Sequence, residues 1–160
     1  MIEFVASPNN QQALTGLQRI VDSLLRPSPS SLSPIQTAIR QGFDENFATE
    51  SAGGAPWAQL APSTVRQRRL LGLSGEHPIL QRSGAYRSTF TRAGNADHVS
   101  TVNYDGGVIH IAEGTGSLLA QFLELGTFRM PARPVLELSP SAIDNVAEAM
   151  TEMVNKILRP

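Results

Sequence analysis

Apolar residues recur every three or four positions along two long stretches, one near each end of the chain. Between residues 10 and 25 the series consists of Ala13, Leu14, Leu17, Ile20, Val21, Leu24 and Leu25. After Ser139-Pro140 it consists of Ile143, Val146, Ala147, Met150, Met153, Val154, Ile157 and Leu158. This spacing places each series on one side of a helix, so both stretches are predicted to be amphipathic helices.

A further helix is predicted between two proline-rich or glycine-rich breaks. Residues 26–31 contain two prolines, which restrict themselves and the residues before them, and this segment is predicted to be a connector. Ser33-Pro34 then supplies an N-cap and a first helical residue. Behind this pair four apolar residues follow at intervals of four: Ile35, Ile39, Phe43 and Phe47. The helix is expected to end near Glu50, ahead of the break at Gly53-Pro56.

Three shorter helices are predicted in the remaining sequence. Residues 62–71 begin with proline, are strongly basic and are closed by Gly72. Residues 83–90 favour a short helix, although Thr89-Phe90-Thr91 would equally suit the start of a strand. Residues 118–125 are apolar enough for a third short helix.

The predicted strands are few and short. Residues 2–5 are expected to open the chain as a strand, and residues 99–111 form a hairpin around an Asp-Gly-Gly turn, which supplies positive φ angles. Residues 113–117 are expected to be a flexible loop and residues 135–138 a strand. Together, the predicted helices and strands indicate one α+β domain over residues 1–160. It combines a small, mostly antiparallel β-sheet with three to four α-helices, including a long C-terminal one.

Composition is typical of a folded, non-exported protein. With 160 residues, 41% hydrophobic and 17% charged, the chain suits one domain and is not a candidate for wholesale disorder. The absence of cysteine excludes a disulfide framework and thiolate metal sites. No apolar run approaches the roughly 20 residues of a membrane helix, and the N-terminus lacks the features of a signal peptide. A soluble protein without a membrane partner is expected.

Positive charge is concentrated in one segment. Residues 62–92 contain six arginines and one glutamate, so they carry +6 − 1 = +5 while the rest of the chain carries −6. A stretch of this kind predicts a local electropositive surface. Such a surface is usually a solvated face or meets the acidic part of a neighbouring copy. Direct contact with nucleic acid is less favoured, because no aromatic residues interleave with the basic run.

The side chains that commonly carry chemistry are scattered. The three histidines have no partner at metal-ligand spacing, and no Gly-x-Ser-x-Gly elbow is present. Gly114-Thr115-Gly116-Ser117 lacks the Gly-Lys-Ser/Thr ending of a phosphate-binding loop. Glu113 and Glu124 have no obvious basic or polar company in the sequence. No enzyme activity, metal or cofactor is therefore predicted.

One stiff segment, the Pro/Arg segment, lies near the C-terminal end and consists of Met130-Pro131-Ala132-Arg133-Pro134. Its prolines hold the backbone extended and present the guanidinium of Arg133 in a fixed direction. That arginine could form a salt bridge within its own chain, to Glu124 or Glu137, or point across a subunit boundary. Both interpretations suit an arginine bracketed by prolines.

Three blocks of the sequence resemble the phage virion-morphogenesis and tail-completion family, whose members act at the head–tail junction of tailed phages. The first is Trp57-Ala58-Gln59-Leu60-Ala61-Pro62-Ser63-Thr64 before the basic helix, and the second is residues 79–88. The third and most specific joins Glu124-Leu125-Gly126-Thr127 to the Pro/Arg segment. Tyr86 departs from the pattern, because an aliphatic residue is usual there.

The resemblance implies a structural virion protein that assembles in the host cytoplasm into a ring, with six copies as the expected number. Other neck and tail proteins would be its partners, and genomic DNA would make transient contact with the lumen of the ring. The expected interface residues are Arg133, Pro131, Pro134, Glu124, Arg66, Arg68 and Arg69. Trp57 is expected to be a core anchor for the helix that follows it. The alternative function is a DNA-contacting module that uses residues 62–92.

Overall fold

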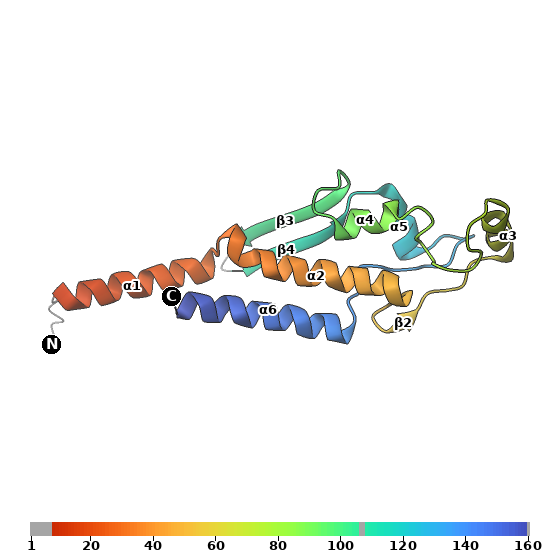
Figure 1. The fold of residues 1–160 in the computed structure, drawn as a ribbon. Coiled ribbons are helices and arrows are strands. Elements are labelled where there is room, and N and C mark those ends of the chain that lie inside the picture. The colour runs from red at the N-terminus through yellow and green to blue at the C-terminus, as the bar shows by residue number, and fades with distance from the viewer. Residues whose placement is uncertain (1–7, 106–107, 160) are drawn as a thin grey trace.

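Two long helices lie side by side through the middle of the molecule, α2 (Pro29–Thr49) and α6 (Pro140–Leu158) (Figure 1). The computed structural model describes residues 8–105 and 108–159. The predicted strand at residues 2–5 and the two glycines of the predicted hairpin turn lie outside these ranges. Within them no helix is long and apolar enough to cross a membrane.

The remaining elements surround this helix pair and extend it at both ends (Figure 1). The amphipathic helix α1 (Pro8–Leu25) projects from one end, and α3 (Pro62–Leu70) lies at the other. The other helices and the strands are α4 (Ala85–Thr91), α5 (Leu118–Leu125), β1 (Ser51–Ala52), β2 (Ala55–Pro56), β3 (His98–Asp105) and β4 (Val108–Thr115). Both α4 and the β3–β4 hairpin pack against α2.

The predicted α+β class is confirmed, with two differences in detail. The described residues form six helices, one at each position where the sequence pattern predicts a helix, so the predicted total of three to four is too low. The strands form two separate antiparallel hairpins, β1–β2 and β3–β4, and no single sheet. The tiny β1–β2 hairpin occupies the glycine-rich break after α2, where Gly53 and Gly54 take positive φ angles.

Helix α2 begins earlier than predicted. Ser28, and not Ser33, is the N-cap, because its side chain accepts a hydrogen bond from the Ser31 N–H and Pro29 follows it. Pro34 therefore lies inside the helix. Two Ser-Pro pairs offered the same start signal, and tertiary packing selected the first, because the earlier start buries Leu32 beside Ile35 against Met153 of α6.

The predicted hairpin is confirmed and is longer than expected. His98 pairs with Thr115 at its open end and Asp105 with Val108 at the turn, so residues 113–115 are strand and the predicted flexible loop there is wrong. Residues 135–138, predicted to be a strand, are irregular. The side-chain amide of Asn46 on α2 donates to the carbonyls of Val135 and Glu137, taking the place of a neighbouring strand.

An aromatic cluster forms the main core between α2, α4 and the segment after β2. Phe47, with no exposed surface, makes edge-to-face contacts with Trp57 and Tyr86, and Phe90 packs against the same ring. Trp57 is buried and its indole N–H donates to the Pro134 carbonyl at 2.7 Å. Aromatic pairs of this geometry each add about 1 kcal/mol beyond their burial.

A buried polar cluster fixes the hairpin to α2. The Glu113 carboxylate has no exposed surface and accepts from Arg40 of α2 at 3.1 Å and from the Ser100 hydroxyl. His98 Nε2 lies 3.1 Å from the same carboxylate, and its Nδ1 faces the Thr89 carbonyl of α4. The sequence prediction that Glu113 lacks basic or polar company is thus wrong. Its partners come from residues far away in the sequence.

We predict that Glu113→Gln lowers the free energy of unfolding by roughly 3 kcal/mol, because it leaves Arg40 without a counter-charge in a mostly buried position. Guanidinium chloride unfolding of dilute protein would measure this. The matched control is Glu76→Gln, which breaks an Arg–Glu pair of the same length on the surface, with Arg69. That change should cost at most about 1 kcal/mol. Equal losses for the two variants would contradict the prediction.

Candidate functional site

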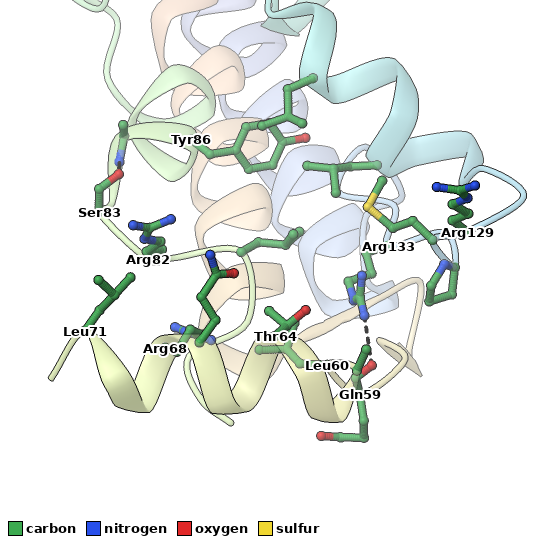
Figure 2. Close-up of a pocket in the computed structure, with 18 residues that line it drawn as sticks. Gln59, Leu60, Thr64, Arg68, Leu71, Arg82, Ser83, Tyr86, Arg129 and Arg133 are labelled. Carbon is green, nitrogen blue, oxygen red and sulfur yellow. Dashed lines mark hydrogen bonds between the residues drawn. The ribbon is translucent and has the colours of Figure 1, made fainter. Parts of the chain in front are cut away.

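A groove of about 670 Å³ opens at the end of the molecule opposite α1, between α3 and α5 (Figure 2). Its lining contains four arginines, Arg68, Arg82, Arg129 and Arg133, and no acidic residue. The rest of the lining is largely apolar, and includes Leu60, Leu71, Leu80, Leu119, Leu123 and Met130. The groove therefore combines apolar walls with an excess of positive charge.

Arg133 is held inside its own chain. The residue is only 5% exposed, and its guanidinium donates to the Ala58 carbonyl at 2.8 Å. It also donates to the Gln59 carbonyl at 2.9 Å (Figure 2). Its backbone N–H donates to the Leu123 carbonyl of α5. Burial lowers the pKa of Arg133. The guanidinium binds backbone carbonyls in place of the carboxylates of Glu124 or Glu137, so its charge is not neutralised by an acid of the same chain.

Two buried polar atoms in the groove lack partners. Arg68 is 7% exposed and donates from Nη2 to the Pro78 carbonyl, but its Nε makes no hydrogen bond. The Tyr86 hydroxyl is also buried and unbonded. Burial, and secondly the charge of Glu124, raise the pKa of Tyr86, so it keeps its proton at neutral pH. Buried donors without partners are rare and costly, so these two atoms are unsatisfied polar groups of the groove lining.

The segment behind the groove is folded by the Glu-Leu-Gly-Thr block. The Glu124 side chain accepts a hydrogen bond from the Val135 N–H at 2.7 Å, and this bond holds α5 beside the end of the Pro/Arg segment. Gly126 has φ of 71°, and a Cβ there would lie 2.7 Å from the Ala132 nitrogen. Only glycine allows this close approach. Burial raises the pKa of Glu124 more than the hydrogen bonds from Val135 and Leu136 lower it.

One lining residue is held in a strained conformation. Leu80 has φ of 58°, in the left-handed region that non-glycine residues seldom adopt. Its neighbours fix it there, because the Ile79 N–H donates to Glu50 and the Gln81 amide donates to the Phe47 carbonyl. Strain of this kind costs about 1 kcal/mol and persists where the surroundings impose it. The wall of the groove is therefore preformed.

The structure separates the seven predicted interface residues and the predicted core anchor, Trp57, into three groups. Arg133, Pro131 and Arg68 line the groove. Glu124, Pro134 and Trp57 lie behind it and hold the Pro/Arg segment in place. Arg66 and Arg69 do not line it; both are exposed on α3, and Arg69 pairs with Glu76.

Sequence reasoning missed Arg82, Arg129 and Tyr86 as groove residues. Arg82 was counted only as part of the basic segment, and Arg129 stands alone in the sequence. Tyr86, noted only as a departure from a motif, faces the cavity (Figure 2). The departure itself was the available signal, because it places a polar atom where an aliphatic side chain is usual.

These features suit the binding of a polypeptide segment that carries carboxylates between apolar side chains. The chain belongs to the phage virion morphogenesis family, whose model matches residues 9–155. It is therefore a bacteriophage protein with a structural or assembly role in the virion. Searches among curated proteins and among solved structures found no match.

We predict that Glu124 makes stability fall as pH rises from about 4.3, the ordinary pKa of a glutamate, to the raised value of the folded state. In this interval the folded protein holds a proton that the unfolded chain has released. Glu124→Gln keeps an oxygen acceptor for the Val135 N–H but has no proton to release in this range. Chemical denaturation of both proteins at a series of pH values would show the variant gaining on the wild type across this window. A constant difference would contradict the prediction.

Proposed function

We propose that the protein is a ring-forming subunit at the head–tail junction of a tailed phage, where it closes the tail or joins it to the head. Family membership supports the virion role. The observation that carries self-assembly is the amount of apolar surface on the described part of the chain, where twenty large hydrophobic side chains are exposed. Extensive exposed apolar surface marks sites where a protein binds other proteins.

Thirteen of the twenty exposed apolar residues lie on or next to three helices. On α1 they are Leu14, Leu17, Val21 and Leu25, and on α6 they are Ile143, Met150, Val154 and Leu158. On α5 and just after it they are Leu118, Leu119, Phe122, Leu125 and Phe128. An isolated 18-residue helix such as α1 is only marginally stable in water, so we expect its apolar stripe to be buried against a partner. The partners would be copies of the chain, six in the expected ring, and other neck and tail proteins.

The alternative of a DNA-contacting module gains little from the structure. Of the six arginines in residues 62–92, Arg68 is buried, Arg69 pairs with Glu76 and Arg87 pairs with Asp44 at 2.7 Å. Half of the positive charge is thus engaged within the chain. What remains supports transient contact with DNA in a lumen and not tight binding.

Phe128→Asp tests the proposal in phage. Phe128 is fully exposed, so the change should leave the subunit folded and disrupt assembly. We predict that a phage lacking the gene accumulates filled heads and separate tails. Wild-type protein should restore joined particles and Phe128→Asp should not, as judged by electron microscopy and plaque counts.

The matched control is Asn103→Asp, which places the same charge on the exposed strand β3 and should restore joining. Circular dichroism and thermal unfolding would verify that both variants are folded. Joined, infectious particles in the complete absence of the protein would refute the proposed function.

A further inference from the structure

We propose that the arginine-lined groove receives the outer face of helix α6 from a second copy of the chain, in a head-to-tail contact. This inference deepens the proposed function and rests on it, since it names the surfaces by which one subunit would bind the next. It is carried by two features of the described residues that match in shape and charge.

The first feature is the apolar stripe on the outer face of α6. Ala142 and Met153 are buried against the body, whereas Ile143, Ala147, Met150 and Val154 are exposed. These four follow at steps of four, three and four, which is the spacing of anchors in helix-in-groove recognition. The groove supplies the matching surface through Leu71, Leu119 and Met130. The neighbouring face of α5 extends that surface with Leu118 and Phe122.

The second feature is the charge beside each apolar surface. Asp144, Glu148 and Glu152 follow at intervals of four along α6 and form one acidic row, which borders the stripe at Asp144, three residues before Ala147. All three are exposed, and none forms a salt bridge within the described part of the chain. The groove offers only positive charge, with Arg82 and Arg129 exposed at its wall. Opposite potentials on facing surfaces set partner choice and register.

The unneutralised charge of the groove explains why a carboxylate is the expected partner. The lining has four arginines and no acid, and Arg133 satisfies its guanidinium only with neutral carbonyls. The Asp144 carboxylate would accept from Arg82 or Arg129, which are exposed, through a charge-assisted hydrogen bond about twice as strong as a neutral one.

The two surfaces lie on different parts of one elongated molecule (Figure 1). Helix α6 lies along the body, whereas the groove opens at the end formed by α3 and α5. A contact between unlike surfaces is heterologous, so every bound subunit offers a fresh surface to the next one. Such contacts build closed rings or open helices, in agreement with the proposed ring.

Cross-linking through introduced cysteines tests the contact directly, because the natural chain has no cysteine. The test protein carries Leu119→Cys in the groove and Met150→Cys on α6; both side chains are about half exposed. A short bismaleimide should convert it into a ladder of dimers, trimers and larger species. Each single variant alone should give no ladder. The reaction is run on purified protein and on assembled particles, so that rings that close only on a partner are also sampled.

The control protein pairs Met150→Cys with Asn103→Cys on the exposed face of β3. It should give no ladder under the same conditions. Abundant dimer from Met150→Cys alone would indicate a two-fold contact between α6 helices and would overturn the inference. So would a Leu119/Met150 pattern no different from that of the control.

A charge exchange provides the second arm. Asp144→Arg and Arg129→Glu should each weaken self-association at least about tenfold, and mixing the two should restore assemblies in which the variants alternate. Growth resumes because each variant alone opposes like charges, whereas in the mixture both the unchanged pair of surfaces and the reversed pair carry opposite charges. If Arg129→Glu assembles normally and loses only duplex DNA in a salt-dependent assay, the groove binds nucleic acid and the inference is wrong.

The outcomes separate this inference from the proposed function. Rings that join heads to tails but give no ladder would retain the function and reject this contact. A ladder from a protein that phages do not need for head–tail joining would retain the contact and reject the function.

Discussion

The structure depends on the way Arg133 ties together segments that lie far apart in the sequence. Its guanidinium binds the carbonyls of Ala58 and Gln59, and its N–H binds Leu123 of α5. The neighbouring Pro134 carbonyl accepts from Trp57 in the aromatic core. An arginine buried on neutral acceptors is costly, because its charge is desolvated without a counter-ion. The hydrogen bonds of Arg133 nevertheless hold the end of α5 near the segment that leads into α3, and the groove lies between the two helices.

The helices and the β3–β4 hairpin could be predicted because the sequence patterns that indicate them are local. The periodic stripes of α1 and α6 and the Asp-Gly-Gly turn each lie within one short window. The failures have a different origin. Residues 135–138 have strand character but are bound by the Asn46 side chain of α2, and the partners of Glu113 lie up to 73 residues away. Interactions of that range leave no periodic trace in the sequence.

The groove could be predicted in part. The Glu-Leu-Gly-Thr and Pro/Arg blocks marked its rear wall, and Arg68 and Arg133 were among the residues expected at an interface. Sequence alone could not show that Arg133 faces inward, since a proline-bracketed arginine suits either direction. Nor could it show that Arg82 and Arg129, 47 positions apart, line one cavity with Tyr86. Separating the arginines that pair internally from those left free required the positions of Asp44 and Glu76.

The projection of α1 has a consequence for how the subunit holds together as a folding unit. Most of its apolar side chains face solvent, so it shares little of the cooperativity that joins α2, α6 and the hairpin. Among the described residues, neither hydrophobic core cluster of the body contains a residue of α1, and the helix by itself is only marginally stable until its stripe is covered. Covering the stripe would add an ordered arm without rearranging the core. The entropy lost in ordering that arm would reduce the free energy gained on association and would not change the stability of the body.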